Sequence, residues 1–522
     1  MSTRWLHGFA LVAALLLLDV SLTFHNVWPT PAISWRGEIS AELAAYLLLS
    51  LWLGRERAIS RRALKLITIV WIFLVVGRYA DVTATALFGR DINLYWDLRF
   101  IPDVVSLLAK AAHAWLALGV AAAIVIVVSI LYFVLRWAIG RVAEAARDGR
   151  ERIVLAAVAA LVLVPGLTIA RPVTLTYARQ IGVAARAMAG KTVVPPSPAM
   201  TSNLARVKDA DVYLIFLESY GAVTFDRPEF ARGLAAPRAV FENAIHETGR
   251  DVVSTFVESP TFGGNSWLAH ISLMSGIEVR DPDVNAMLMA QKRETIVTSF
   301  KRQGYRTVAL MPGLWQAWPE GRFYGFDEIY GGERLNYQGP EFGWFDIPDE
   351  YALAKFDALE AARAPRPPIF MFFPTISTHT PFKPTPPYQP DWKRVLTDQP
   401  FDQPDLDRAF DEPADWLNLG PSYVDAMAYT YTTLSGYLRA NASRDFVMIL
   451  LGDHQPPALV SGEGAPWDVP VHVIASRRAV LDALVSKGFK RGLTPARPDL
   501  SKMNALLPVL LDSFADPVVL RH

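Results

Sequence analysis

Long apolar runs are concentrated in the first third of the chain. Five of them approach the ~20 apolar residues that a helix needs to cross ~30 Å of hydrocarbon. The second is the shortest, because its apolar run covers only Leu43–Leu53 and contains Ser50. The pattern therefore predicts an α-helical membrane domain of five transmembrane helices over residues 1–170, at about 5–24, 38–54, 64–82, 111–135 and 153–170.

Basic residues in two loops indicate how these helices are oriented. Arginine and lysine cluster at 55–65, between the second and third helices, and at 136–152, between the fourth and fifth. Loops of this kind stay on the cytoplasmic side of a membrane. We therefore expect a multi-pass protein of a bacterial inner (plasma) membrane with a cytoplasmic N-terminus. Five crossings then put everything after residue 170 outside, in the periplasm or the extracellular space.

Two charged side chains fall inside this apolar region. Asp19 and Arg78 lie at similar depth in two helices that are expected to run outward. A charge at that depth is unfavourable unless it is paired. The sequence allows either an ion pair between them or two side chains that extend separately to the outer interface.

Residues 171–208 differ from both neighbouring parts of the chain. Arg179, Arg186 and Lys191 interrupt an otherwise apolar stretch, which is typical of a helix that lies at the bilayer surface. The prolines of Val194–Pro198 then break regular structure. We therefore expect a juxtamembrane connector that leads into an outer domain.

Short apolar runs rich in β-branched and aromatic residues alternate with helical stretches from residue 209 onward. Continuous apolar strands that alternate with helices indicate a largely parallel sheet that is covered on both faces. Residues 209–522 are therefore expected to form an α/β domain. Its strands are expected at Val212–Leu217, Thr307–Met311, Ile369–Phe373, Phe446–Leu451 and Val469–Ile474, and its helices at about 267–275, 292–303, 350–362, 421–440, 478–487 and 501–513.

Composition and charge exclude several classes of protein. The chain has 522 residues and no cysteine, which rules out disulfides, thiolate zinc sites, Fe–S clusters and a cysteine nucleophile. Its net charge is zero, but residues 1–200 hold 20 Lys and Arg against 11 Asp and Glu, so this part carries +9 and the rest −9. We expect no nucleic-acid partner. A phosphate site is still compatible with this balance, because such a site depends on local groups.

Acidic and histidine residues follow two of the expected strands. Ligands of such sheets bind beyond the carboxyl ends of the strands. Glu218 follows the first strand, and Asp453 and His454 follow the strand Phe446–Leu451. Two carboxylates and an imidazole suit one divalent metal ion, Mn, Zn or Mg. Each residue alone could be a solvated loop residue, but three at one sheet edge favour a metal site.

Three further places carry candidate chemistry. Ser266 follows two glycines and opens a helix, where backbone N–H groups favour an anion; an ordinary helix cap is the alternative. A metal on its oxygen would lower the pKa of the hydroxyl, as a nucleophile requires. His379 follows a third strand and could orient a phosphate or protonate a leaving oxygen. Arg322, close to Trp318, could pair with a substrate anion.

The order of these motifs resembles the sulfatase-like branch of the alkaline phosphatase superfamily. The shared features are Glu after strand one, a hydroxyl past two glycines, Thr-x-x-x-His-x-Pro-Phe at Thr375–Phe382, and Gly-Asp-His after a late strand. Membrane helices in front look like the lipoteichoic acid synthase group of phosphoglycerol transferases. The resemblance implies a metal held by Glu218, Ser266, Asp453 and His454, and a substrate-binding His379.

Spacing within the resemblance points to Ser266 as the nucleophile. In sulfatases the nucleophile begins a segment that ends in Leu-Thr-Gly. Here Ser266 begins a segment that ends in a similar way, at Leu273–Gly276. Thr261 is the alternative nucleophile. His270 falls where sulfatases have an arginine, so the resemblance implies substrate binding there. Trp318 and Arg322 lie near the family's phosphate-binding segment, which has no clean match here.

The departures from the family's pattern argue against some of the reactions that the family catalyses. Without cysteine, sulfatase chemistry through formylglycine and a disulfide-rich phosphoethanolamine transferase are both disfavoured. We expect a membrane-anchored phosphotransferase that moves a phospholipid head-group unit through a covalent Ser266 intermediate to a glycan or lipid acceptor outside the membrane. The alternatives are a phosphodiesterase or phosphatase of the same superfamily, and a non-catalytic membrane sensor. The Pro- and Asp-rich segment Pro384–Pro421 is either a lid or acceptor surface, or a disordered spacer.

Overall fold

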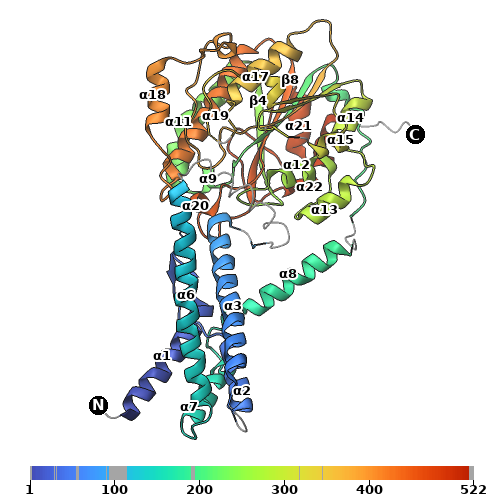
Figure 1. Cartoon of the computed structure of the whole chain (residues 1–522). Coiled ribbons are helices and arrows are strands. Elements are labelled where there is room, and N and C mark those ends of the chain that lie inside the picture. The colour runs from blue at the N-terminus through green and yellow to red at the C-terminus, as the bar shows by residue number, and fades with distance from the viewer. Residues whose placement is uncertain are drawn as a thin grey trace, which may run out of the picture. The chain divides into compact units, whose positions relative to one another are not determined.

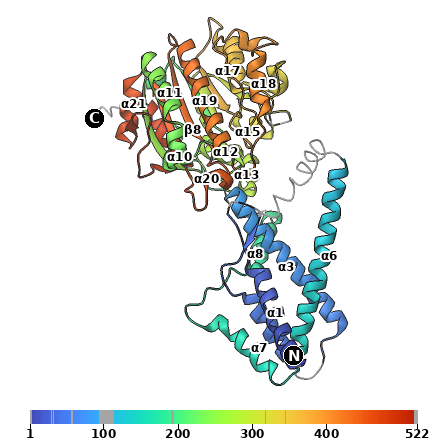
Figure 2. The same cartoon turned by 90° about the vertical axis from the view of Figure 1, so that its left-hand side faces the viewer.

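The chain folds into two compact units, Met1–Lys191 and Thr192–His522, and their division falls inside the expected connector. Figures 1 and 2 show the first unit mainly as helices and the second as a sheet with helices around it. A computed structural model describes residues 3–28, 30, 32–54, 58–89, 91–92, 114–189, 194–316, 318–343 and 345–516.

Three helices of the first unit are long and apolar enough to cross a membrane among the residues described. The expected second and fifth spans form helices of 13 and 10 residues. At 1.5 Å per residue these are about 20 and 15 Å long, shorter than the hydrocarbon layer. The count of five spans is therefore not confirmed. The helices are α1 (Thr3–Thr23), α2 (Ala41–Leu53), α3 (Arg61–Phe88), α6 (Ala114–Ala145), α7 (Glu151–Ala160) and α8 (Val173–Met188).

Asp19 and Arg78 do not pair with each other. Asp19 accepts a hydrogen bond from the backbone N–H of Ser40 at 2.9 Å. Arg78 is 3% exposed and donates to the carbonyl oxygens of Phe24 and Thr23, at 2.8 and 3.4 Å. The arginine therefore satisfies the free carbonyls at the end of α1. Both side chains join α1 to neighbouring segments, which neither sequence-based alternative included.

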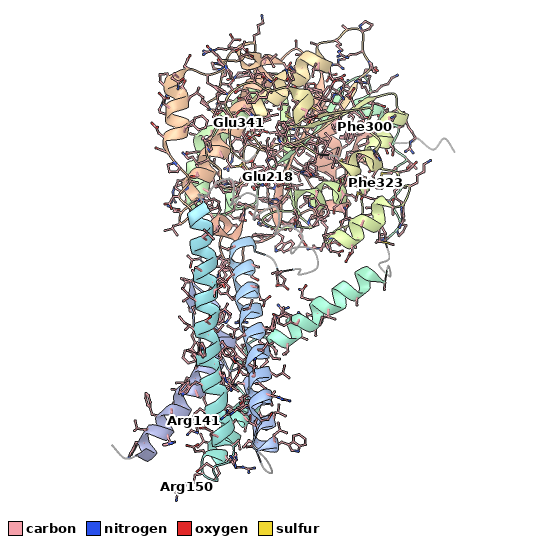
Figure 3. The ribbon with its side chains drawn as sticks, viewed as in Figure 1. Arg141, Arg150, Glu218, Phe300, Phe323 and Glu341 are labelled. Carbon is pink, nitrogen blue, oxygen red and sulfur yellow. The ribbon has the colours of Figure 1, made fainter. Side chains whose placement is uncertain are left out.

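Arg141, near the end of α6, joins this helix to α1 and α7. Arg141 donates to Glu151 at 2.5 Å and to the carbonyl oxygen of His7 at 2.9 Å. Figure 3 labels Arg141 and Arg150 at this end of α6 (Figure 3). The acidic partner lies in the first turn of α7, where a negative charge is favourable.

The second unit is built on a nine-stranded mixed sheet, so the α/β prediction is confirmed. The sheet has the order β10-β4-β9-β8-β3-β7-β5-β6, with β11 paired to β4. The five neighbours from β8 to β6 are parallel, whereas β9 is antiparallel to both β8 and β4. The strands are β3 (Asp211–Leu217), β4 (Asp251–Glu258), β5 (Arg306–Met311), β6 (Glu328–Gly331), β7 (Ile369–Pro374), β8 (Phe446–Gly452), β9 (Asp468–Ala475), β10 (Lys490–Arg491) and β11 (Ser501–Lys502).

Helices cover both faces of this sheet, each with its own apolar core. In β3, Val212, Leu214 and Phe216 point to one core, and the alternate residues Tyr213 and Ile215 point to the other. This alternation follows from the two-residue period of a strand. The first core is closed by α12 (Ser266–Ser275), α14 (Ile296–Arg302), α21 (Arg478–Ser486) and α22 (Met503–Phe514), and the second by α11 (Ala235–Glu247), α17 (Asp349–Phe356) and α19 (Gly420–Ala440).

The segment Pro384–Pro421 is folded onto the domain and is not a disordered spacer. It contains a short 3-10 turn at Arg394–Leu396 and the helix α18 (Gln403–Asp411). Phe401 and Phe410 from this segment pack against Phe342, with ring centroids 5.5 and 5.2 Å apart. Aromatic contacts of this kind hold the segment in place.

Candidate active site

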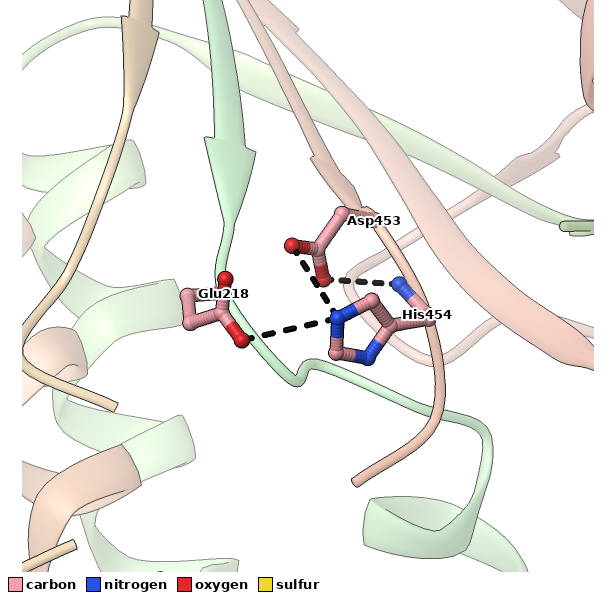
Figure 4. Close-up of side chains that lie close together, drawn as sticks. All are labelled: Glu218, Asp453 and His454. Carbon is pink, nitrogen blue, oxygen red and sulfur yellow. Dashed lines mark hydrogen bonds and ion pairs between the residues drawn. The ribbon is translucent and has the colours of Figure 1, made fainter. Parts of the chain in front are cut away.

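Three predicted metal ligands meet at the carboxyl edge of the central strands. Glu218 follows β3, and Asp453 and His454 follow β8, which is the parallel neighbour of β3. Their ligand atoms all lie within 4.8 Å of one another (Figure 4). His454 Nε2 lies 3.5 Å from Glu218 Oε1 and 3.6 Å from Asp453 Oδ2. Parallel pairing of two strands therefore brings together residues that are more than 230 positions apart.

Hydrogen bonds orient these groups toward one point. The Nδ1–H of His454 donates to the carbonyl oxygen of Gln455 at 2.7 Å, so Nε2 keeps its lone pair. Asp453 Oδ1 accepts from the backbone N–H groups of Ser219 and His454, at 2.9 and 2.7 Å. Asp453 Oδ2 is buried and has no hydrogen-bond partner among the described residues. A buried carboxylate oxygen without a donor needs a positive partner.

Ser266 joins the same group. Its Oγ lies 2.9 Å from Glu218 Oε2 and 3.1 Å from His454 Nε2. The turn before it, Gly263–Asn265, has three successive positive φ angles of 64°, 146° and 60°. Such a turn lets the chain reverse sharply, so that Ser266 begins α12 at the metal group.

Thr261, the alternative nucleophile, has another partner. Its hydroxyl donates to the carbonyl oxygen of Gly264 at 2.6 Å, and the side chain is 3% exposed. This bond closes the turn that carries Ser266. The geometry therefore favours Ser266 as the hydroxyl beside the carboxylates.

The charges of the group fit a divalent cation. Burial raises the pKa of Asp453 well above its usual range, and the neighbouring Glu218 adds to the effect. Burial would also raise the pKa of Glu218, but His454 and His379 outweigh it and lower the pKa. Two acidic side chains, a lone-pair nitrogen and a hydroxyl thus converge on one point, and a cation there would relieve the burial of Asp453. This donor set suits Zn²⁺, Mn²⁺ or Mg²⁺.

His379 lies close enough for its charge to act on this group. Its field lowers the pKa of both Glu218 and His454. Its Nδ1–H donates to the carbonyl oxygen of Thr380 at 2.8 Å, and its ring packs on Phe345 with centroids 5.0 Å apart. These two contacts hold the ring beside the carboxylates.

His270 lies one turn behind Ser266 in α12. It is 8% exposed, and its ring packs against Phe216 and Phe372, with centroids 4.5 and 5.3 Å away. Its Nε2 is buried and unpartnered among the described residues. Burial lowers the pKa of His270 to about 3, so the ring is neutral. A neutral imidazole therefore stands where the sulfatase pattern has a cation.

The structure does not connect Trp318 and Arg322 to the metal group. Trp318 packs against Phe372 and Phe326, with ring centroids 6.3 and 6.2 Å away. Arg322 is exposed on α15 (Pro319–Tyr324). Within the described ranges neither side chain forms a hydrogen bond or ion pair with Glu218, Asp453 or His454. Their expected role in anion binding therefore has no support in the geometry.

Several residues that position the site were not predicted from the sequence. Ser219 Oγ donates to Glu218 Oε1 at 2.9 Å, and Thr378 Oγ1 donates to the carbonyl oxygen of Glu218 at 2.5 Å. Asp349 accepts from the N–H groups of Ile376 and Ser377, at 2.8 and 2.9 Å, and so holds the turn that leads to His379. Ser219 and Thr378 are sequence neighbours of the predicted Glu218 and His379, so the sequence could have indicated them. Nothing in the sequence marks Asp349.

His472 is a buried residue of β9. Ser254 gives its only hydroxyl hydrogen to the carbonyl oxygen of Gly492 at 2.6 Å, so it accepts from His472 Nδ1 at 2.7 Å. His472 Nε2 then accepts from the hydroxyl of Tyr220 at 2.9 Å. This hydrogen-bonded chain joins β9 and β4 to the loop after Glu218.

One family model matches part of the outer domain. Residues 274–469 match the family model described as Sulfatase. No curated protein sequence matches the chain. The match includes the predicted His379, Asp453 and His454 and begins after Ser266.

Three solved structures are similar to part of this chain. They are the lipoteichoic acid synthase LtaP from Listeria monocytogenes (14% identity, 56% of this chain and 71% of that chain, TM-score 0.38), the C-terminal periplasmic domain of EcEptC from Escherichia coli in complex with Zn (14%, 55% and 78%, 0.36), and the Streptococcus pyogenes phosphoglycerol transferase GacH in complex with sn-glycerol-1-phosphate (12%, 64% and 80%, 0.36). All three TM-scores are below 0.5, so these likenesses carry no argument about the fold or the activity of this chain.

Proposed function

We propose, from the premise that the outer domain is a sulfatase-like domain of the alkaline phosphatase superfamily, that this chain is a membrane-anchored, metal-dependent phosphotransferase. The single observation that carries the proposal is the convergence of Ser266 with Glu218, Asp453 and His454. A hydroxyl beside two carboxylates and an imidazole is the set that covalent phosphoryl transfer with one metal requires.

The same four side chains would hold the metal ion, which would be Mn, Zn or Mg. When bound, it would supply charge that favours the ionised hydroxyl and polarises a phosphoryl oxygen. Glu218 Oε2 already accepts the hydrogen bond from Ser266 Oγ at 2.9 Å. This oxygen is therefore the proton acceptor when Ser266 reacts.

In the first half-reaction, Ser266 Oγ attacks the phosphorus of a phospholipid head-group phosphodiester. The new bond joins Oγ to phosphorus, and the bond between phosphorus and the diacylglycerol oxygen breaks. The hydroxyl proton passes to Glu218, and protonated His379 gives a proton to the leaving oxygen. The products are diacylglycerol and a head-group phosphate ester of Ser266.

In the second half-reaction, a hydroxyl of a glycan or lipid acceptor attacks the same phosphorus. His379 takes the acceptor's proton, and Ser266 regains its proton from Glu218 as the ester bond breaks. With water as the acceptor the same steps give hydrolysis. The acceptor alone therefore separates the transferase from a phosphodiesterase.

The membrane part fits a lipid donor. Three apolar helices long enough to span a bilayer support a membrane anchor in the first unit. We propose that residues 1–170 form this anchor with a cytoplasmic N-terminus, that 171–208 connect it, and that 209–522 act outside a bacterial inner membrane. An anchored domain would stay close to a donor that diffuses in the same bilayer.

The Ser266→Ala variant tests the covalent step. Full-length protein in detergent is incubated with Mn²⁺ and head-group-labelled phosphatidylglycerol, quenched, and analysed by mass spectrometry for a label on Ser266. We expect diacylglycerol release and a labelled peptide in the wild type and neither in the variant. The control is Ser275→Ala in the same helix, whose hydroxyl donates to the carbonyl of Ile271 at 2.6 Å.

Full activity of Ser266→Ala would refute the covalent mechanism. Label that appears on added glycan supports the transferase, and label that appears only as free glycerol phosphate supports the phosphodiesterase. A wild type that binds neither Mn²⁺ nor Zn²⁺ would favour a non-catalytic sensor instead.

A further inference from the structure

One backbone carbonyl links the candidate metal ligand to the candidate nucleophile. The carbonyl oxygen of Gln455 accepts from His454 Nδ1–H at 2.7 Å and from the backbone N–H of Gly263 at 3.1 Å. The first bond fixes which nitrogen of His454 has a free lone pair. The second fixes the start of the turn Gly263–Asn265 that carries Ser266. A shift of this carbonyl would therefore disturb both groups together.

The side chain of Gln455 anchors this carbonyl from the other side. It is fully buried, and its Oε1 accepts from the backbone N–H of Val223 at 3.2 Å. Its Nε2 donates to the carbonyl oxygen of Pro466 at 3.0 Å. Both ends of the amide are thus bound to backbone groups of two different segments, the start of α9 (Val223–Asp226) and the loop before β9. These bonds leave the residue little freedom to turn its main chain.

Gly221 provides the space that this arrangement needs. A Cβ atom at Gly221 would lie 1.7 Å from Gln455 Oε1 and 2.8 Å from its Cα. Any larger residue would therefore push Gln455 away from Val223 and Pro466. The loop after Glu218 and the loop after His454 are packed together at this glycine.

We propose that Gln455 is a positioning residue that sets the His454 tautomer and the Ser266 turn through its carbonyl oxygen. The inference rests on the proposed function, because it needs a metal at His454. Partners of metal-bound histidines typically change metal affinity by about 10–100-fold when they are removed. Gln455 acts one step further away, through its own backbone.

Gln389 offers a matched control for a Gln455→Ala variant. It is 7% exposed, its Nε2 donates to the carbonyl oxygen of Pro400 at 2.6 Å, and its Oε1 accepts from Asp391 N–H at 3.0 Å. Each alanine variant thus leaves one backbone N–H and one proline carbonyl without their partners. Stability losses should be similar, whereas only Gln455 is joined to the metal group.

The test measures Mn²⁺ and Zn²⁺ binding to full-length protein in detergent by calorimetry, alongside thermal unfolding of the metal-free protein. We expect Gln455→Ala to raise the metal dissociation constant about 10-fold or more, and Gln389→Ala to leave it within about twofold. The two unfolding midpoints should fall by similar amounts. Equal metal affinity in both variants would overturn the inference.

A second variant covers the case in which Gln455→Ala does not fold. Gln455→Glu keeps an acceptor for Val223 N–H and loses the amide donor to Pro466. We expect a smaller but measurable loss of metal affinity, and wild-type affinity would overturn the inference. A wild type that binds no metal would instead refute the proposed function, so the two failures are distinguishable.

Discussion

Glu350 gives a quantitative prediction, because it is buried and forms no ion pair with the residues that the structure describes. The side chain is 0% exposed in α17. Its Oε2 accepts from Gln389 N–H at 3.2 Å, and its Oε1 has no hydrogen-bond partner among the described residues. Burial raises the pKa of Glu350 from 4.5 to about 8. The folded protein therefore keeps a proton that the unfolded chain loses near pH 4.5.

The sign and size of the effect follow from this difference. Between pH 4.5 and 8 the native state binds one proton more than the unfolded state, so the free energy of unfolding falls as pH rises. The stability that the protonated Glu350 contributes is fully present below pH 4.5 and lost above about 8. A difference of about 3.5 pH units at about 1.36 kcal/mol each gives an upper bound of about 5 kcal/mol.

The perturbation is Glu350→Gln, which is neutral at every pH. We expect the variant to unfold within about 1 kcal/mol of the wild type at pH 4.5 and to be more stable at pH 9. Structural relaxation and water that enters the site make the charged Glu350 less unfavourable than this upper bound implies. We therefore expect the variant to be more stable than the wild type by about 2–3 kcal/mol at pH 9. Thermal unfolding of full-length protein in detergent, followed by tryptophan fluorescence from pH 4.5 to 9, measures the difference.

Glu360 provides a contrast of opposite sign. It is 2% exposed but paired with Arg306 and with the hydroxyl of Tyr330, each at 2.6 Å. Burial would raise its pKa, but these partners outweigh burial and lower it. Glu360→Gln should therefore lose stability most at high pH. If Glu350→Gln shows no gain between pH 4.5 and 9, Glu350 is ionised in the fold and the reasoning fails.

Four further substitutions test the parts that position the site. Asp349→Asn should lower the catalytic rate but leave metal affinity unchanged, as rate measurements and calorimetry would show. An amide oxygen can accept only one of the two backbone hydrogen bonds, so the turn before His379 should lose about 1–3 kcal/mol of stability. Gly452→Ala should yield no folded protein in expression trials, since a Cβ would lie 1.8 Å from the carbonyl oxygen of Tyr220. Gly264→Ala meets no atom within 4 Å, so its φ of +146° alone should reduce stability, by about 1–3 kcal/mol in thermal unfolding. His472→Leu should lower the unfolding midpoint while metal binding, measured by calorimetry, persists.

The strands that the sequence predicted are those buried on both faces. β3, β5, β7, β8 and β9 each contain a continuous apolar run that the surrounding helices cover. β4 was missed because Ser254 and Thr255 interrupt its apolar run. Both are buried, and Ser254 is satisfied by Gly492 and His472, which are over 200 residues away in the sequence. Such long-range partners leave no local signal.

Helices were predicted where their apolar face is wide. α19 and α12 match the expected ranges within about one residue. α11 was missed because only Phe241, Ala244 and Ile245 are buried in it, a narrow apolar face. In the membrane part, composition alone could not show that α2 ends at Gly54, or that α7 gives way to a 3-10 turn at Leu161. Hydropathy indicates where a helix is apolar better than where it stops.

The candidate ligands were easier to predict than the groups that hold them. Glu218, Asp453 and His454 are polar residues placed directly after apolar strands, and the topology of a parallel sheet brings such positions together. Gln455 contacts His454 through a backbone oxygen, and any residue type has one. Its specific contribution depends on Gly221 and Pro466, which approach it only in the folded chain.

The charges at the site explain how a chain with zero net charge could bind phosphate. Within the described residues, no lysine or arginine forms an ion pair with Glu218 or Asp453. His270 is held neutral by burial, so α12 brings no formal positive charge behind Ser266. Two carboxylates alone would repel an anion. If phosphate binds at this edge of the sheet as we propose, it would depend on a bound metal ion and on His379, and the bulk charge of either unit would have little bearing on it.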